Sequence, residues 1–309
     1  MRNILITGGH GFVGGRLAEF LAKNDKYNVA VTSRNPNNIG NAKIKRIKVN
    51  TKTDELSIIL KGYHTVIHLA ALDAQNCVSN PFDAIDVNIG DTLRWRIAAD
   101  RACVHQFIYF STIHVYGNST ADLLNEESFL STIHPYAISH RSAEDYVMSP
   151  WYNQNSKAIV FRLSNTFGYP AGEISQWHLV ILDFCKQATE TNKIVINSNS
   201  SQLRDFISLE DVCRCVQYSI EHSIDSGIYN LSSGLNKTLL EVANTIKNIA
   251  QEKYNQSVEV LEKVARTEVK QSLISNKKLG QLGFLPSNDL ESEVRNLLGY
   301  CKQTFKTTW

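Results

Sequence analysis

Short apolar runs alternate with helical patterns over the first half of the chain. Mainly apolar runs predict six strands, at residues 4–6, 29–31, 47–49, 65–69, 107–110 and 159–161. Between them, apolar residues recur at helical spacing and predict helices over residues 12–21, 56–60, 85–103 and 136–148. Strands that are apolar at nearly every position are buried on both faces, and strands that alternate with helices form parallel sheets. The pattern therefore predicts an α/β fold with a doubly wound parallel sheet.

The alternation weakens after Gly168. Beyond it the sequence has helical stretches and little strand signal, and the best helical period runs over residues 239–250. We interpret this part as a smaller C-terminal substrate-binding lobe, interrupted by a segment that returns to the main sheet. The predicted domains are residues 1–168 with about 203–236 for the sheet, and about 169–202 with 237–309 for the lobe.

Composition narrows the classes of partner. The 32 Lys and Arg residues against 30 Asp and Glu leave a formal net charge of +2, so no nucleic-acid partner is expected. No uncharged apolar run approaches the ~20 residues that cross a bilayer, and the run at residues 4–6 is too short for a secretory signal, so we expect no membrane partner. The nine histidines and six cysteines have no zinc-binding or CxxC spacing. We therefore expect a cytoplasmic chain with reduced thiols and no metal.

A glycine-rich segment joins the first strand to the first helix and reads TGGHGFVG. Gly8 would permit a tight turn, Gly11 would let the backbone approach a pyrophosphate, and Gly14 would let the helix pack against the strand. The helix N-terminus, with the backbone N–H groups of Phe12 and Val13, would face the phosphates. The segment predicts a Rossmann-type dinucleotide site; a glycine turn without a ligand is the alternative.

The end of the second strand bears on which dinucleotide is bound. An NAD site usually places Asp or Glu here to accept from the ribose 2′-hydroxyl, and the sequence has Ser33 and Arg34 instead. Arg34 could pair with a 2′-phosphate, which favours NADP(H). If Arg34 stacks on adenine or faces solvent, NAD(H) remains open.

Two later segments, YFSTIHVYG at residues 109–117 and PYAISH at residues 135–140, complete a family pattern. With the glycine segment they resemble the extended short-chain dehydrogenase/reductase family, in particular its nucleotide-sugar epimerases, dehydratases and reductases. Five further segments follow in the family's order, at residues 68–71, 87–88, 162–168, 204–207 and 229–234. The resemblance covers nearly the whole chain. It implies a nicotinamide dinucleotide as cofactor and a nucleotide-diphosphate sugar as substrate.

The resemblance also implies roles for residues at the catalytic and substrate positions. Thr112 would hydrogen-bond the reacting sugar oxygen, and Tyr136 would be the general acid or base. Asn165 and Arg204 would contact the substrate diphosphate. For Arg204 the alternative is an ion pair with a neighbouring acidic residue, Asp205 or Asp211.

A second set of residues would line the cofactor. The resemblance places Asn50, Leu69, Ala70 and Ala71 there, together with Tyr136 and His140. Asn88 would hold the loop before the catalytic strand and line the nicotinamide pocket, and its alternative is a helix cap or a strand-end turn. The resemblance further implies a homodimer formed through the helices at about residues 91–104 and 136–148.

One position departs from the family pattern. Four residues after the catalytic tyrosine the family has a lysine, which lowers the tyrosine pKa and binds the nicotinamide ribose; here the residue is His140. An imidazole is shorter than lysine and largely neutral above pH 7. Two interpretations stay open. Either His140 is a working catalytic substitute, with activity favoured at lower pH, or the chain binds its cofactor with weak or lost catalysis.

A second departure narrows the reaction. The family's 4,6-dehydratases have Asp and Glu directly after the catalytic threonine, and this chain has Ile113 and His114. Isoleucine cannot transfer a proton, so a dehydratase is not expected. NADP(H)-dependent reduction of a 4-keto-6-deoxy sugar nucleotide is the favoured interpretation, and an epimerase with a retained cofactor is the alternative.

Overall fold

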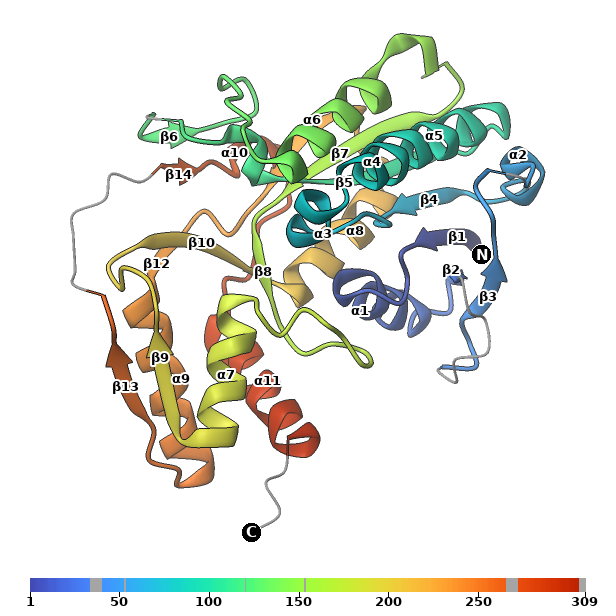
Figure 1. Cartoon of the computed structure of the whole chain (residues 1–309). Coiled ribbons are helices and arrows are strands. Elements are labelled where there is room, and N and C mark those ends of the chain that lie inside the picture. The colour runs from blue at the N-terminus through green and yellow to red at the C-terminus, as the bar shows by residue number, and fades with distance from the viewer. Residues whose placement is uncertain (34–40, 53, 120, 153, 265–271, 306–309) are drawn as a thin grey trace.

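A parallel sheet of seven strands forms the centre of the molecule (Figure 1). The computed structural model describes residues 1–33, 41–52, 54–119, 121–152, 154–264 and 272–305. The strand order is β11-β7-β5-β4-β1-β2-β3. The strands are β1 (Arg2–Thr7), β2 (Tyr27–Ser33), β3 (Lys45–Lys48), β4 (Thr65–His68), β5 (Gln106–Thr112), β7 (Lys157–Leu163) and β11 (Gly227–Leu231). All six predicted strands are present, and β11 adds a seventh from the later part of the chain, whereas β10 (Leu203–Ser208) of the same predicted segment lies in another sheet.

Helices cover both faces of this sheet. Along β1, Ile4 and Ile6 are buried toward one face and Leu5 toward the other. The first face is covered by α1 (Phe12–Ala22) and α8 (Leu209–His222), the second by α2 (Leu56–Ile59), α5 (Thr92–Arg101) and α6 (Pro135–Met148). Burial on both sides is why the strands are apolar at successive positions. The predicted doubly wound Rossmann-type fold is confirmed.

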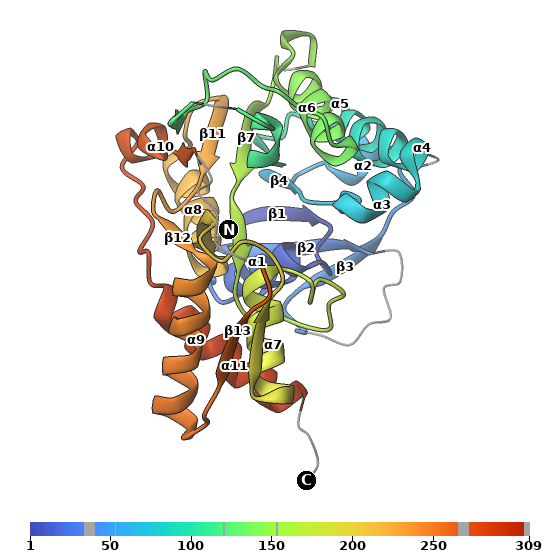
Figure 2. The ribbon, with the colours of Figure 1, turned by 60° about the vertical axis from the view of Figure 1, so that its left-hand side comes forward.

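A second apolar core lies beyond the sheet, where Figure 2 shows α7, α9 and α11 side by side. This unit contains α7 (Val180–Thr191), β9 (Lys193–Ile196), α9 (Leu239–Tyr254), β13 (Glu259–Glu262) and α11 (Leu290–Thr304). Helix α9 begins with a capping box in which Thr238 and Glu241 satisfy each other's backbone N–H groups. No helix in the described ranges is long and apolar enough to cross a bilayer.

Short elements that the sequence did not predict connect the two cores. A three-stranded sheet is formed by β8 (Asn165–Phe167), β10 (Leu203–Ser208) and β12 (Asn236–Thr238). A two-stranded sheet joins β6 (Leu123–Leu124) to β14 (Leu273–Ile274). The remaining elements are α3 (Ala74–Ser79), α4 (Pro81–Ala84), η1 (Ile85–Asp91), η2 (Ile113–Tyr116), η3 (Pro150–Tyr152) and α10 (Lys277–Gln281), of which η1 is the first part of the helix predicted over residues 85–103.

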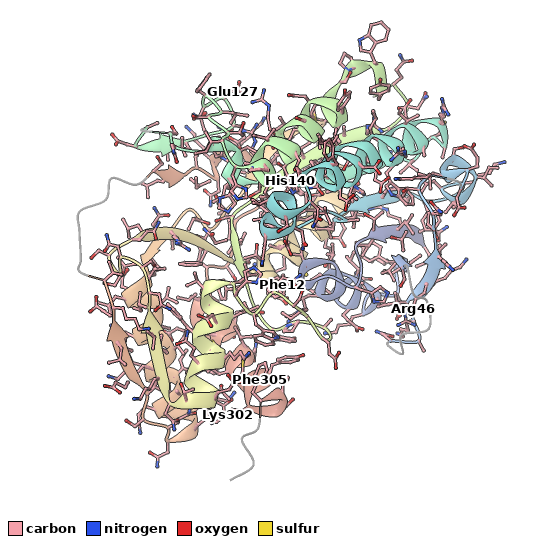
Figure 3. The ribbon with its side chains drawn as sticks, in the orientation of Figure 1. Phe12, Arg46, Glu127, His140, Lys302 and Phe305 are labelled. Carbon is pink, nitrogen blue, oxygen red and sulfur yellow. The ribbon has the colours of Figure 1, made fainter. Side chains whose placement is uncertain are left out.

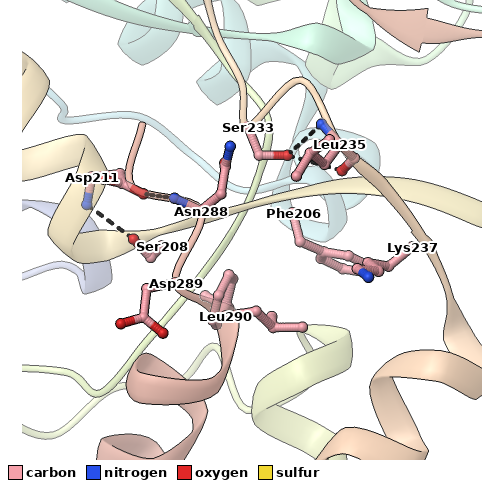
Figure 4. A pocket seen from close by; sticks show the side chains of 10 residues that line it. Phe206, Ser208, Asp211, Ser233, Leu235, Lys237, Asn288, Asp289 and Leu290 are labelled. Carbon is pink, nitrogen blue, oxygen red and sulfur yellow. Dashed lines mark hydrogen bonds between the residues drawn. The ribbon is translucent and has the colours of Figure 1, made fainter. Parts of the chain in front are cut away.

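A small cavity marks the joint between α8, β10 and the start of α11 (Figure 4). Its volume is about 30 Å³, which is room for about one water molecule. Beside it, the Asp211 carboxylate accepts from the Ser287 N–H at 2.8 Å and the Ser287 hydroxyl at 3.0 Å. The joint is therefore packed and hydrogen-bonded, and too small for a nucleotide.

A buried carboxylate also links α11 to α1. Glu293 is 4% exposed, and its Oε1 lies 3.7 Å from the Arg16 guanidinium, which also pairs with Glu210 at 3.0 Å. Burial raises the pKa of Glu293 to about 7, although Arg16 opposes this. A carboxyl group whose pKa is raised on folding holds a proton that the unfolded chain has already lost. Its contribution to stability therefore falls as the pH rises from about 4.5 to about 7.

We expect Glu293→Gln to stabilise the protein by about 2–3 kcal/mol more at about pH 8 than at about pH 5, relative to the unchanged chain. Chemical denaturation at the two pH values measures the difference. Glu291→Gln on the exposed side of the same helix is the matched control and should show no such pH dependence. Parallel stability curves for Glu293→Gln and the unchanged chain would contradict the assignment.

Candidate active site

The glycine segment forms a close turn between β1 and α1. Gly8 has φ +68°, and a Cβ there would lie 2.8 Å from the Ala70 nitrogen. A Cβ on Gly14 would lie 2.3 Å from the Gly8 oxygen. The N-cap residue of α1 is Gly11, and no side chain caps the first turn. The first N–H groups of the helix are therefore open to an anion, as a pyrophosphate site requires.

Gly14→Ala should destabilise the protein by about 1–3 kcal/mol and weaken dinucleotide binding at least about tenfold, because the methyl group forces the turn apart. The next residue supplies the control. A Cβ on Gly15 meets nothing closer than 3.5 Å, so Gly15→Ala should be neutral or slightly stabilising. Denaturation and calorimetry with dinucleotide test both variants, and equal effects would show that the space around Gly14 is not the constraint.

Phe12 and Val13 contribute to this turn only through their backbone. The Phe12 ring is 6% exposed and packs in the second core with Phe167 and Leu209 (Figure 3). Val13 is partly buried between the two cores. The helix start is thus anchored on the lobe side, and its N–H groups are the part that can face phosphates.

The end of β4 lies against the glycine turn. The Thr7 hydroxyl accepts from the N–H groups of Leu69 and Ala70, both at 3.2 Å, and bonds the His68 ring at 2.7 Å. Burial lowers the pKa of His68 to about 3, so this ring is neutral. Ala71 follows with an exposed side chain. The structure therefore brings residues 69–70 beside Gly8.

Asn88 ties the loop after β4 to α6. Its Oδ1 accepts from the Leu72 N–H at 2.7 Å, and its Nδ2 donates to the Ser139 hydroxyl at 3.0 Å. It lies inside the π-helical segment η1, so it is not a helix cap. A π-helical turn of this kind, which widens a helix by one residue per turn, often occurs at functional sites. The bonds place Asn88 between the cofactor loop and the helix that carries Tyr136.

Thr112 and Tyr136 meet where β5 ends and α6 begins. The ring of His134 caps α6 by accepting from the Tyr136 N–H at 3.2 Å, and Pro135 occupies the first turn. Burial raises the pKa of Tyr136 to about 12, and the hydrogen bond with Thr112 opposes part of that rise. Tyr136 is therefore a neutral phenol that holds its proton.

His140 lies one turn further along α6 and is buried (Figure 3). The two rings meet edge to face with centroids 4.4 Å apart. Its Nδ1 lies 2.8 Å from the Tyr109 hydroxyl, and its Nε2 is buried with no partner in the described part of the chain. Burial lowers the pKa of His140 to about 3. A cationic His140, and the gain of activity at lower pH that it would bring, are therefore not expected.

Asn165 and Arg204 lie on neighbouring strands, β8 and β10. The Asn165 amide donates to the Asp205 carbonyl at 2.8 Å, and the Arg204 guanidinium donates to Gln202 at 2.9 Å. Arg204 forms no ion pair within the described ranges. The two proposed acidic partners are engaged elsewhere, Asp205 by Ser233 and Asp211 by Arg214. The ion-pair alternative for Arg204 is therefore wrong.

His114 joins this side of the site, although no positive role was predicted for it. Its ring centroid is 6.3 Å from that of Tyr136. Partial burial and the Arg204 guanidinium lower its pKa. Its position two residues after Thr112 is the sequence feature that could have predicted its place in the site.

Arg46, on β3 at the edge of the site, is a cation that the sequence analysis did not predict there. Arg46 pairs in register with Val31, and a Cβ on Gly9 would lie 2.4 Å from Val31. The Arg46 Nε is buried without a partner among the described residues. Burial and the Arg46 charge lower the pKa of His10, within the glycine turn. The effect of Arg46 on His10 places the Arg46 charge near that turn.

Three other predicted cofactor positions lie nearby in sequence. Ser33 ends β2 and is buried. Arg34 lies outside the described residues. Asn50 uses its side chain to accept from the Lys52 N–H at 3.0 Å and is exposed, so it closes the turn after β3.

Comparison with known proteins decides the family. The family model described as "NAD dependent epimerase/dehydratase family" matches residues 4–232. The chain belongs to the NAD dependent epimerase/dehydratase family. This confirms the resemblance and establishes an enzyme of the nucleotide-sugar epimerase and dehydratase type.

Individual relatives have low sequence identity to this chain, but the matches span nearly the whole of both chains. A putative UDP-glucose 4-epimerase of Methanocaldococcus jannaschii is 26% identical, over 98% of this chain and 100% of its own length. A dTDP-D-glucose 4,6-dehydratase of Bos taurus is 23% identical, over 98% of this chain and 90% of its own. The structure of a UDP-N-acetylglucosamine 4-epimerase of Methanobrevibacter ruminantium is 24% identical, with a TM-score of 0.85 over 98% of this chain and 99% of that one. The similarity to the Methanobrevibacter structure shows a shared fold.

The open glycine cradle and the unpartnered His140 Nε2 both fit the nicotinamide dinucleotide that the epimerase/dehydratase family implies. Backbone N–H groups at the start of α1 would hold the phosphates, and a donor beneath Tyr136 would face the nicotinamide end. When bound, that group supplies or accepts hydride.

Proposed function

We propose that the chain is an NADP(H)-dependent reductase of a keto-sugar nucleotide, with a 4-keto-6-deoxy sugar as the favoured substrate. The observation that carries the proposal is the position of Tyr136, which is hydrogen-bonded to Thr112 and packs edge to face on the His140 ring. A ketone reduction needs a proton donor at the carbonyl oxygen, and a tyrosine whose pKa is raised by burial to about 12 holds its proton throughout the physiological range. Oxidation of an alcohol needs the phenolate, which neither a lysine nor a charged His140 stabilises here.

The chain's own groups have distinct roles in this reaction. The carbonyl carbon gains hydride while the Tyr136 O–H bond breaks and the proton moves to the carbonyl oxygen, which gives an alcohol and a phenolate. Solvent then returns a proton to the phenolate. Thr112 hydrogen-bonds the reacting oxygen and orients it toward Tyr136. The reacting carbon must therefore lie above the junction of β5 and α6.

Arg204 and Asn165 are the proposed contacts for the substrate diphosphate. The guanidinium is bound only to a neutral amide among the described residues, so its charge is not neutralised within the chain. Arginine suits bidentate contact with phosphate. His114, between Arg204 and Tyr136, would face the sugar.

The preference for NADP(H) rests on charges at the adenosine end. The end of β2 lacks the acidic residue that an NAD ribose requires, and Arg46 adds a cation beside the glycine turn. Ser33 and Arg34 remain the predicted contacts to the 2′-phosphate. We assign Arg46 the same role, as a second cation.

Arg46→Gln should weaken NADP(H) binding by about 10–100-fold and leave NAD(H) binding within about threefold, because a charged hydrogen bond to the 2′-phosphate is lost. Calorimetry with the two dinucleotides measures the ratio. Lys45→Gln removes the same charge from the neighbouring exposed position and is the control. Equal losses for NAD(H) and NADP(H) would place Arg46 outside the 2′-phosphate site.

A second candidate is a nucleotide-sugar 4-epimerase, favoured by the full-length match to the Methanocaldococcus relative. Such an enzyme keeps its cofactor and uses hydride transfer in both directions. It would need Tyr136 as base and as acid within one cycle.

One experiment separates these functions. The purified chain is mixed with UDP-, GDP-, dTDP- and CDP-linked sugars and keto-sugars, with and without NADPH, and followed by nicotinamide absorbance and by NMR of the sugar. Loss of absorbance with a keto-sugar supports the reductase. Inversion without added reductant supports the epimerase. Dinucleotide binding with no turnover of any sugar would favour the interpretation of lost catalysis.

The domain division, the homodimer and the cytoplasmic location stay predictions. Sedimentation of the purified chain tests the dimer.

A further inference from the structure

The buried pair formed by Tyr109 and His140 lies beneath the proposed acid. Tyr109, on β5, is 2% exposed, and its hydroxyl bonds the His140 Nδ1 at 2.8 Å. No second partner for this hydroxyl occurs in the described part of the chain. On the other side of the imidazole, Nε2 is also buried and without a partner. The pair is therefore hydrogen-bonded between the Tyr109 hydroxyl and Nδ1 and has one open end, the unpartnered Nε2.

Either direction of the hydrogen bond leaves one buried hydrogen without an acceptor in the free protein, the Tyr109 O–H if His140 donates through Nδ1 and the His140 Nε2–H if Tyr109 donates. If Tyr109 donates to Nδ1, the Tyr109 hydroxyl is satisfied and the unpaired hydrogen lies on Nε2, on the side of the imidazole away from Tyr109, where a ligand oxygen could accept it. We propose that Tyr109 is a positioning residue that holds His140 as the neutral Nε2–H tautomer, so that Nε2 is a hydrogen-bond donor for a ligand oxygen.

The surroundings keep the ring neutral. Glu144, the next residue on the same side of α6, is bound by Arg162 at 2.8 Å and is not available to His140. The other titratable groups around the pair are His68 from β4, His114 from η2, and Tyr136 with Cys77 near it. His140 forms no ion pair with another residue of the described ranges. Burial, which lowers the pKa of His140, agrees with this.

The chemistry of the open end indicates the class of ligand. A neutral ring offers one N–H and no charge, which suits a hydroxyl oxygen better than a phosphate. The group next to Tyr136 in a bound dinucleotide would be the nicotinamide ribose, and this part of the inference rests on the proposed function. Lysine offers three donors and a positive charge, whereas His140 offers one donor whose direction depends on Tyr109.

The tautomer is tested in the ligand-free protein. Histidine labelled with ¹⁵N gives different shifts for a protonated and an unprotonated ring nitrogen, and the His140 signals are assigned by their absence in His140→Gln and His140→Asn. We expect an Nε2–H tautomer at neutral pH, and a mixture of tautomers in Tyr109→Phe. An Nδ1–H tautomer or a charged ring in the unchanged protein would overturn the proposal.

The positioning role is tested by dinucleotide calorimetry on four proteins, namely the unchanged chain, Tyr109→Phe, His140→Gln and the double variant. The amide N–H of glutamine reaches about as far as Nε2 and needs no tautomer to be fixed. We expect Tyr109→Phe to weaken binding about three- to tenfold in the unchanged background and not at all beside His140→Gln.

The control is Tyr63→Phe, which alters a tyrosine packed against the same apolar core and should leave the affinity unchanged. An equal loss from Tyr109→Phe in both backgrounds would make its role merely structural, and no loss in either would also overturn the proposal. If the unchanged chain binds no dinucleotide, the proposed function fails, while the ¹⁵N spectrum still decides the tautomer.

Discussion

Tyr136→Phe is expected to lower the turnover of a keto-sugar nucleotide by about 100- to 10,000-fold, the usual contribution of a general acid. Removal of the hydroxyl leaves the carbonyl oxygen without its proton donor, while the ring still packs edge to face on His140. Dinucleotide affinity should therefore stay within about threefold. Steady-state kinetics and calorimetry on the same preparation separate the two effects.

The matched control is Tyr146→Phe on the same helix. The Tyr146 side chain is 42% exposed, and its loss of a hydroxyl should not alter turnover. If Tyr136→Phe leaves the rate unchanged, Tyr136 is not the acid, and His114 is the next group to replace because its ring lies 6.3 Å from that of Tyr136. If the rate falls equally in both variants, the effect is structural.

The direction of catalysis follows from the same group. A tyrosine with a pKa of about 12 is a weaker acid than an ordinary tyrosine, but near neutral pH it is almost wholly in the protonated form that a reduction needs and scarcely in the phenolate form that an oxidation needs. Reduction should therefore be the faster direction near neutral pH, and oxidation of the product alcohol should accelerate as the pH rises toward the pKa. An epimerase needs both directions in one cycle and is less well served by this site.

The fold was largely predictable because its strands are buried on two faces. Ile4 and Ile6 pack toward one set of helices and Leu5 toward the other, which forces an apolar residue at each position. Strands such as β8 and β12 have three residues each, too few for any period to be recognised. The π-helical hydrogen bonds of η1 are also invisible in the sequence, because the apolar spacing there is close to that of an α-helix.

The site was predictable where chemistry depends on spacing along the chain. The glycines and the pair Tyr136 and His140 are of this kind. Tyr109 was hidden because it lies in an apolar strand and resembles any core aromatic residue. Arg46 was hidden because basic residues alternate along its strand and indicate a solvated edge. Only the register of β3 against β2, which sets Arg46 opposite Val31, places it beside the glycine turn.

Arg162→Met is expected to destabilise the protein by about 3–5 kcal/mol, because it leaves the Glu144 carboxylate buried without its cation. The two side chains are 3% and 1% exposed, and their closest atoms are 2.8 Å apart. Arg162 also donates to the Tyr116 hydroxyl at 3.1 Å, which in turn donates to Asn230 at 2.6 Å. The network thus supports η2, directly after Thr112, and the helix that carries His140.

The paired replacement distinguishes desolvated charge from loss of packing. Arg162→Met with Glu144→Leu removes both charges, so it should be less destabilising than Arg162→Met alone, since apolar groups of similar volume often replace a buried ion pair at little cost. The exposed pair Arg141 and Asp145, 38% and 65% exposed on the same helix, is the control, and Arg141→Met should cost no more than about 0.5 kcal/mol. Chemical denaturation measures these three variants and Glu144→Leu alone. If the double variant is as unstable as the sum of its single changes, the side chains act by their shape and hydrogen bonds to Tyr116, and the buried charge is not what the fold is built to neutralise.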